Sequence, residues 1–242
     1  MKKLIGLSFF AFMIMMIFSS NIHAALVISE LDCDTEGADS AEFVEILNTG
    51  LELYDFFLNP VVLVFFNGDK ENDPSYRAVD LEGTLNSGGV LVVGGPNVSP
   101  VPDIAMGSGF IQNGADAVAL YPGKATDWAN GSAAAGGYID ALVYDTDETD
   151  DSGLLAIFDV LDGIQVNENT KGNKDFDSIQ RIEAGLGGSH FIVGPATPGE
   201  STLVPLPGAI YLLSSGFIAM IWMRSRSKEE CLVRPYEAYD DH

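Results

Sequence analysis

The stretch Ala41-Glu-Phe-Val-Glu-Ile-Leu-Asn48 carries the pattern that decides the fold. In an extended chain, Phe43 and Glu45 point to one face, while Val44 and Ile46 point to the other. Glu42 falls on the face of Val44 and Ile46, which is expected where a position is recessed at a strand end or turned toward a ligand. Turn residues follow at once. The stretch therefore predicts a β-strand that ends in a tight turn.

The same period of two recurs through residues 25–200, in short runs of β-branched and aromatic residues. Turn sequences such as Asn67-Gly68-Asp69 separate these runs. The pattern predicts an all-β fold, an antiparallel sandwich or barrel, with one or two helical turns at 154–161. The expected strands are 26–31, 42–47, 61–66, 90–93, 117–120, 138–144, 177–182 and 191–193.

The N-terminal residues 1–24 have the features of a secretory signal peptide. Lys2 and Lys3 precede an apolar core, and the small residue Ala24 suits a cleavage site. An uncleaved N-terminal anchor is the alternative. Export of the following region is therefore expected.

A second apolar run, residues 206–223, contains 18 residues without an ionisable side chain. As a helix it would extend about 27 Å, which matches the hydrocarbon thickness of a bilayer and predicts a transmembrane helix. Arg224 and Arg226 lie on one flank only. The positive-inside tendency then places the C-terminus in the cytoplasm and the region 25–200 outside.

The region between the two apolar runs is strongly acidic. The whole chain has 35 Asp and Glu against 12 Lys and Arg, and residues 25–203 hold 30 of the acidic but only six of the basic residues. Such a field repels phosphate backbones, so no nucleic-acid partner is expected, whereas divalent cations or cationic partners are favoured. Solubility in a salty exterior is the alternative explanation.

The two cysteines, Cys33 and Cys231, lie on opposite sides of the proposed span. No disulfide is therefore expected between them, and Cys33 is expected to be buried or half-buried.

The candidate metal site is the acidic segment 32–42. Its oxygen-bearing residues at alternate positions before Gly37 resemble the first half of an EF-hand loop. The match fails at position 12, which is Phe43, and no flanking helix is expected. Calcium is thus the candidate cofactor, and the alternative is a solvated acidic turn that binds no metal. The acidic run 145–151 has the same two interpretations. The proposed ligands are Asp32, Asp34, Glu36 and Asp39.

Catalytic signatures are sparse in the exported region. Its one histidine, His190, follows Ser189 without the further partner that a nucleophilic or zinc site needs. Carboxylates are plentiful, but no spacing singles out a catalytic pair. We therefore expect a protein that is not an enzyme.

The ordered motifs of residues 25–200 resemble lamin-tail domains. Val27-Ile-Ser-Glu-Leu31 and the stretch 41–48 are similar to that family's opening strands, and 80–85, 89–94, 111–121, 140–144, 178–181 and 196–199 follow in the family's order. The resemblance implies an immunoglobulin-like β-sandwich, which in bacteria forms exported modules attached to nucleases, other hydrolases or surface anchors. Segment 122–177 departs from the family pattern as an insertion, where a locally added function is expected.

Val204-Pro-Leu-Pro207, the apolar run 206–223 and the basic residues from Arg224 to Lys228 form a three-part pattern, which is similar to a PEP-CTERM sorting signal of the VPLP type. The resemblance implies recognition by an exosortase-type processing enzyme. A plain single-pass anchor is the alternative, and the tail 229–242 is longer than is usual in that family. The residues of the implied sorting motif are Val204, Pro205, Leu206, Pro207, Arg224 and Arg226.

These features divide the chain into a signal peptide (1–24), a β-sandwich (25–200), a linker with the start of the sorting motif (201–205), a transmembrane helix (206–223) and a basic cluster with a cytoplasmic tail (224–242). The composition of 197–202 is also typical of a linker. The predicted function is a non-catalytic surface or envelope module, with the membrane, an exosortase, and extracellular polysaccharide or surface proteins as partners. Two alternatives stay open: a calcium-dependent adhesin or carbohydrate-binding module, and an accessory domain of an extracellular hydrolase or nuclease.

Overall fold

The computed structural model describes residues 26–159, 163–184 and 188–200. The chain divides into two compact units, Met1–Pro205 and Leu206–His242, and every described residue belongs to the first. The predicted signal peptide, sorting motif and transmembrane helix lie outside the described residues. Within the described part, no helix is long and apolar enough to cross a membrane.

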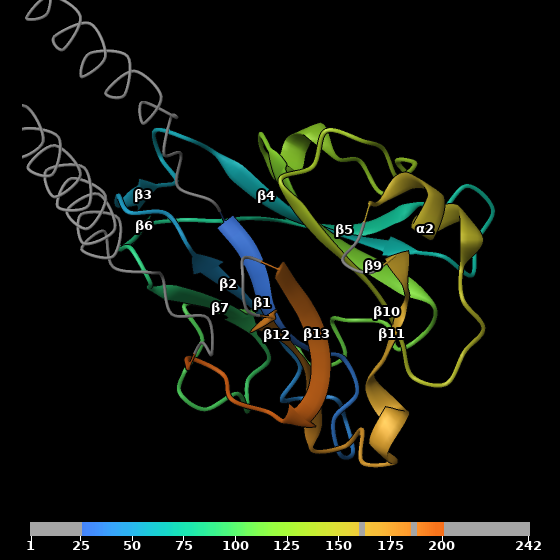
Figure 1. Ribbon diagram of the computed structural model, residues 1–242. Helices are drawn as coiled ribbons and strands as arrows, with labels where there is room; N and C mark the ends of the chain where they lie inside the picture. The colour runs from blue at the N-terminus through green and yellow to red at the C-terminus, as the bar shows by residue number, and fades with distance from the viewer. Residues whose placement is uncertain (1–25, 160–162, 185–187, 201–242) are drawn as a thin grey trace, which may run out of the picture. The chain divides into compact units, whose positions relative to one another are not determined.

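Two β-sheets are layered on each other (Figure 1). The six-stranded sheet has the order β13-β12-β1-β2-β7-β8, the five-stranded sheet has the order β11-β10-β9-β4-β5, and β3 pairs with β6. The strands are β1 Leu26–Asp32, β2 Phe43–Asn48, β3 Tyr54–Asp55, β4 Val61–Asn67, β5 Ser75–Asp80, β6 Thr84–Leu85, β7 Val90–Gly94, β8 Ile104–Ala105, β9 Asp116–Pro122, β10 Asp140–Asp145, β11 Val166–Asn167, β12 Asp177–Ala184 and β13 Gly188–Pro195. The helices are η1 Ala125–Asp127, α2 Ser152–Ile157 and η3 Glu168–Lys171.

The main hydrophobic core lies between the two sheets. Antiparallel pairing of β1 with β2 sets Ile28 opposite Ile46 and Leu31 opposite Val44, so these side chains share the inner face. The five-stranded sheet contributes Leu63, Phe65, Val118 and Leu120 from the other side. The prediction of an all-β sandwich is confirmed, as is the alternation along β2. Glu42 is recessed directly before that strand.

All eight expected strands are present, within a few residues of their expected ends. The expected helical turn is α2, where the Asp151 carboxylate accepts a hydrogen bond from the Leu154 N–H at 2.7 Å and caps the helix. Strand β5 was not predicted. Its residues are polar or half-buried, so the sequence lacks the apolar alternation that marks the other strands.

The outer face of the five-stranded sheet is covered by an apolar layer. Much of this cover comes from the inserted segment 122–177, whose loops and α2 lie beside β9 and β4 in Figure 1. The Phe66 ring packs with ring centroids 5.6 Å from Trp128 and 5.6 Å from Phe158. We call this layer the apolar cover, and its buried members are Leu154 and Phe158. It packs on outward-facing side chains of the sheet itself, which are Val62, Val64, Phe66, Ala117, Ala119, Tyr121, Ala141 and Val143.

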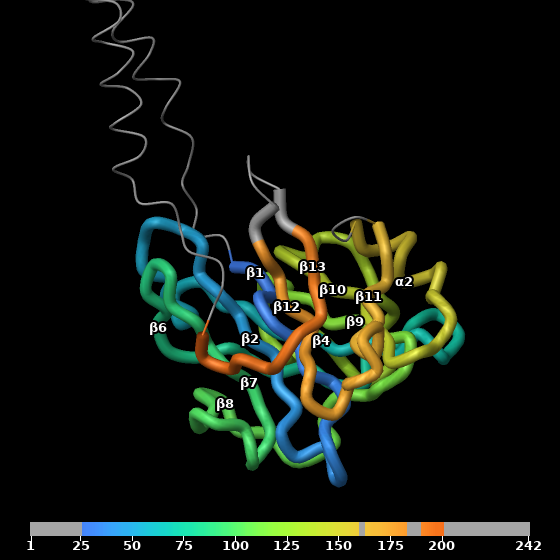
Figure 2. Tube along the Cα trace, turned by 60° about the horizontal axis from the view of Figure 1, so that its bottom comes forward, coloured from blue at the N-terminus to red at the C-terminus, as the bar shows by residue number. Residues whose placement is uncertain are grey.

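The outer face of the six-stranded sheet is crossed by residues 196–200, which we call the strap (Figure 2). Thr197 donates its N–H to Glu30 Oε1 at 2.7 Å and its hydroxyl to Glu30 Oε2 at 2.8 Å. The Gly199 N–H donates to Glu45 Oε2 at 2.8 Å. Thr197 and Gly199 therefore belong to the folded domain, and the linker prediction is wrong for these residues.

A partly buried ion pair connects the two sheets. Arg181 on β12 reaches Asp140 on β10, with Nη2 2.6 Å from Oδ2. The same Asp140 oxygen accepts the Ile28 N–H at 2.7 Å, and Arg181 Nε donates to the Ile28 carbonyl at 2.8 Å. The guanidinium also lies 4.7 Å from the centroid of the Phe191 ring. This contact joins β1, β10, β12 and β13 in one charged and hydrogen-bonded network.

Candidate functional site

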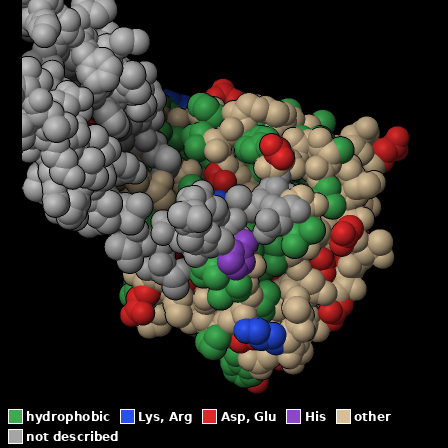
Figure 3. Space-filling model, viewed as in Figure 1, with side chains coloured by type: hydrophobic (Ala, Val, Ile, Leu, Met, Phe, Trp, Pro, Cys, Tyr) green, Lys and Arg blue, Asp and Glu red, His purple; other side chains and the backbone are tan. Residues whose placement is uncertain are grey.

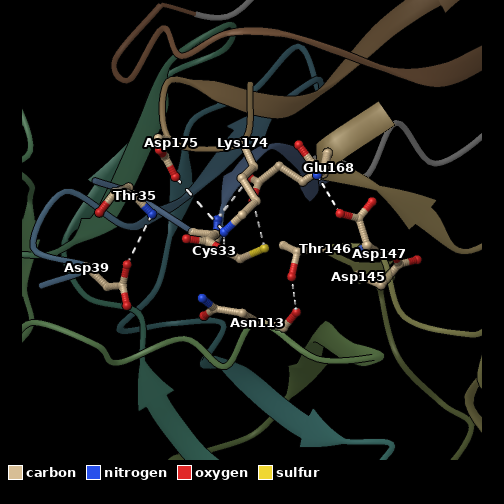
Figure 4. Close-up of polar contacts among 12 residues, drawn as sticks. Cys33, Thr35, Asp39, Asn113, Asp145, Thr146, Asp147, Glu168, Lys174 and Asp175 are labelled. Atoms are coloured by element: carbon tan, nitrogen blue, oxygen red, sulfur yellow. Dashed lines mark hydrogen bonds and ion pairs between the residues drawn. The ribbon is translucent and has the colours of Figure 1, made fainter. Parts of the chain in front are cut away.

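Charged side chains gather at one end of the sandwich, the lower end in Figure 1 (close-up in Figure 4). They come from the end of β1 and the segment after it (32–42), from the end of β10 and the segment after it (145–151), and from the stretch 168–175. We call this group the acidic end. Its carboxylates are Asp32, Asp34, Asp39, Glu42, Asp145, Asp147, Glu168 and Asp175, and Lys174 lies among them.

A thiol and a carboxylate form its most buried contact. Glu168 Oε1 accepts the Cys33 N–H at 3.0 Å, and the Cys33 thiol donates to Glu168 Oε2 at 3.0 Å. Both side chains are 0% exposed, so the expectation of a buried Cys33 is confirmed. Burial raises the pKa of Glu168 to about 8 and the pKa of the Cys33 thiol well above its usual value. The protonated thiol is thus a hydrogen-bond donor that fixes the end of β1 against η3.

Asp32 lies next to this contact and is itself buried. Burial, together with the neighbouring acids Glu168, Glu30, Glu42 and Asp34, raises its pKa to about 10. Asp32 is therefore protonated at neutral pH in the described structure. A neutral carboxyl must lose its proton before it can serve as an anionic metal ligand.

The four proposed calcium ligands do not converge. Asp34 forms an ion pair with Lys174, and Asp39 accepts the Thr35 N–H at 3.2 Å and so closes its own turn. Glu36 is exposed. Within the described residues, no three His, Cys, Asp or Glu side chains are placed to hold a metal ion. Calcium binding by this segment stays a prediction, and the positions of these side chains do not favour it.

Two carboxylates of the acidic run 145–151 accept hydrogen bonds from side-chain amides. Asp145 Oδ2 accepts a hydrogen bond from Gln165 Nε2 at 2.8 Å. Asp147 accepts hydrogen bonds from the side-chain amides of Asn167 and Asn169, and these bonds lower the pKa of Asp147. The segment therefore packs against residues 165–169, which lie within the inserted segment.

The glutamates of the opening motif bind backbone N–H groups. Glu42 Oε2 accepts the N–H groups of Phe110 and Ile111 at 2.8 and 3.2 Å. Burial raises the pKa of Glu42 to about 8 and that of Glu45 to about 7. Glu45 also accepts the Ser29 hydroxyl at 2.6 Å. These acids thus connect distant segments of the fold.

Accessibility limits what these groups can do chemically. A general acid or base must come within hydrogen-bond distance of its substrate. The carboxyls with pKa values of about 7 to 8 are Glu42, Glu45, Asp116 and Glu168, and each is at most 1% exposed. His190 lies on β13 opposite Ile182. The arrangement suits structural hydrogen bonding better than catalysis.

No protein-family model matches the chain, and no curated protein matches it either. Glu168 and Lys174 were not predicted as site residues, because they lie 135 and 140 residues from their partners Cys33 and Asp34. Local spacing carries no signal for contacts of that separation.

Proposed function

We propose that the chain is an exported, envelope-held β-sandwich of lamin-tail type, with an immunoglobulin-like arrangement, which acts as a non-catalytic interaction module. The observation that carries the interaction role is an exposed apolar segment at residues 51–58. Phe57 is 89% exposed, Leu58 71%, Leu53 52% and Leu51 40%. Four large apolar side chains exposed within eight residues are typical of an interaction surface.

The chemistry of this segment favours a protein partner over a polysaccharide. Leucine and phenylalanine side chains gain by burial against other apolar groups, at about 25 cal/mol per Å² removed from water. Asp55 holds the segment in shape, because its carboxylate accepts the Phe57 N–H at 2.9 Å and the Leu58 N–H at 3.2 Å. The exposed side chains are therefore presented on an ordered turn.

The family assignment is supported by the contacts of the motif residues. Glu42 and Glu45 of the opening motif bind distant backbone groups, as described above. Asp140 and Arg181, from two later motifs, form the ion pair between the sheets. Motif residues that are far apart in the sequence thus contact distant parts of the fold, as expected if the ordered motifs determine the fold.

The envelope location is supported by the position of the strap relative to the sorting motif. The strap is bound to Glu30 and Glu45 through Thr197 and Gly199, and Val204 follows only a few residues later in the sequence. A domain folded up to this point would be held close to the membrane by the 206–223 run. Its acidic surface, part of which Figure 3 shows, suits the exterior.

The location is tested by fractionation of the source cells and mass measurement of the recovered protein. We expect a membrane-associated or surface form that lacks residues 1–24. A surface form without the 206–223 run supports exosortase processing, whereas a surface form that retains Trp222 identifies a plain anchor. Recovery of the full-length chain as a soluble protein inside the cell would contradict the proposal.

The interaction role is tested by cross-linking on intact cells, with wild type and the double variant Phe57→Ala/Leu58→Ala. We expect the wild type to yield a discrete cross-linked protein partner that the double variant loses. The double variant Glu71→Gln/Glu82→Gln, which changes two exposed residues outside 51–58, should keep the partner. Equal cross-linking of all three proteins would contradict an interaction through residues 51–58.

A further inference from the structure

A second group of oxygen atoms lies at the adjoining ends of β4 and β9. Antiparallel pairing sets Asn67 opposite Asp116, so their side chains are neighbours on one face of the sheet. Asp116 Oδ1 accepts the Gly68 N–H at 3.1 Å. We call this place the Asp116 corner, and it is separate from the acidic segment 32–42.

Two oxygen atoms in the corner are buried without a hydrogen-bond partner among the described residues. They are Asp116 Oδ2 and Asn67 Oδ1. The Asp116 side chain is only 1% exposed. A buried acceptor without a donor costs roughly 1–3 kcal/mol, and more when it is charged, so such an oxygen indicates a partner of another kind.

The free oxygen of Asp116 points into a space that another carboxylate also reaches. A β-carbon added to Gly114 would lie 2.7 Å from Asp69 Oδ2 and 3.7 Å from Asp116 Oδ2. Gly114 thus lets both carboxylates lie close to the same position. Asp69 is exposed, whereas Asp116 is buried.

Further acidic groups surround the corner. Asp69, Glu148 and Asp151 are the charged groups that act on Asp116, and all three raise its pKa in addition to the effect of burial. Asp151 also raises the pKa of Asp73. Two separate segments thus direct negative charge toward the buried oxygen of Asp116 at the start of β9: the β4–β5 connection and the segment after β10.

We propose that the Asp116 corner binds a calcium ion, with Asp69, Asp116 and the Asn67 amide oxygen as side-chain ligands. Calcium takes six to eight oxygen ligands from carboxylates, amides, backbone carbonyls and water, in flexible geometry. A set with two carboxylates and an amide agrees with the finding that no three acidic side chains converge within the described residues. The bound ion would connect the β4–β5 connection to the turn before β9.

The site does not depend on export of the protein, so its failure would leave the proposed function untouched.

The test is calorimetric titration of the full-length protein in detergent with CaCl₂, and separately with MgCl₂. We expect one calcium per chain with a Kd on the order of 10⁻⁴–10⁻³ M, the range of extracellular calcium modules. Asp69→Asn should weaken binding at least tenfold without a folding defect, because Asp69 is exposed. Asp116→Asn should do the same while it keeps an acceptor for the Gly68 N–H, and the exposed control Glu82→Gln should bind as wild type does.

The possible results separate this site from the others. No calcium binding by the wild type, or unchanged binding by Asp69→Asn, would overturn the proposal. Loss of binding in Asp32→Asn/Asp34→Asn but not in Asp69→Asn would place the ion in the segment 32–42 and overturn it too. Magnesium binding at least as tight as calcium binding would overturn the choice of ion.

Discussion

The two sheets are covered on their outer faces in opposite ways. The five-stranded sheet is covered by side chains of the inserted segment, among them Trp128, Leu154 and Phe158, which pack against Phe66 and its neighbours. The six-stranded sheet is crossed by the strap, whose groups donate hydrogen bonds to the buried carboxyls of Glu30 and Glu45. One cover is apolar and non-directional, and the other is polar and specific.

The stability that each of the two covers contributes therefore depends on a different physical quantity. Apolar burial depends on the area removed from water and hardly on pH. A buried carboxyl introduces a dependence on pH, because burial penalises its charged form. The side of the strap that binds Glu45 is therefore expected to respond to pH, whereas the apolar cover is not.

The largest effect is expected from Phe158→Ala in the apolar cover. Phe158 is 1% exposed and packs on Phe66 and Tyr138, so the truncation leaves a cavity. The free energy of unfolding should fall by about 3–5 kcal/mol. The loss should be the same at pH 5 and pH 8, as measured by urea denaturation.

The matched control is Phe57→Ala, the same substitution at a side chain that is 89% exposed. It should change the free energy of unfolding by no more than about 0.5 kcal/mol. A loss at Phe158→Ala as small as at Phe57→Ala would mean that the inserted segment does not pack as a cover.

The next effect concerns pH and Glu45. Its pKa is raised from 4.5 to about 7 in the folded protein, so between these values the folded state binds more protons than the unfolded state. The stability that Glu45 contributes is fully present below pH 4.5 and is lost as the pH rises through 7. Glu45→Gln should reduce the fall in unfolding free energy between pH 4.5 and pH 8 by about 2–3 kcal/mol.

Denaturation curves across that pH range provide the measurement. Glu82→Gln, an exposed glutamate, should leave the slope as in the wild type. A wild type that becomes more stable as the pH rises from 4.5 to 8 would contradict the assigned burial of these acids, since Glu42 and Glu168 are shifted in the same direction.

The smallest effect is expected from Thr197→Val in the strap. The change removes the hydroxyl that donates to Glu30 Oε2 at 2.8 Å but keeps the N–H and nearly the same shape. A loss of about 1–2 kcal/mol is expected. Thr84→Val, at an exposed position of β6, is the matched control and should be neutral. Equal stability of the two variants would show that the hydroxyl contributes nothing to the strap.

The sequence predicted the long strands because their signal is local. The alternation along 41–48 indicates a strand and its inner face, and the wholly apolar run 61–66 indicates a strand that is buried on both faces. Strand β5 lacked that signal. Its neighbouring residues Tyr76 and Arg77 are both half-buried, so apolar and polar side chains do not divide between the two faces of the strand. Alternation thus identifies strands that have one clearly apolar face.

The sites were less predictable because their contacts join distant residues. Glu30 meets Thr197 across 167 residues, and Cys33 meets Glu168 across 135. The acidic segment 32–42 looked like a metal loop from its spacing, yet Asp34 is paired with Lys174 and Asp39 closes its own turn. Ligand spacing along one segment does not reveal which of its charges other segments already neutralise.

The central structural claim is that the domain is folded through residue 200, up to the edge of the sorting signal. Hydrogen exchange of the full-length protein in detergent tests it directly, because the N–H groups of Ala196, Thr197, Gly199 and Glu200 all donate hydrogen bonds. We predict that these amides are protected, with Thr197 and Gly199 exchanging at rates near those of β1 and β2. Exchange of all four amides at the rate of an unstructured peptide would contradict the account.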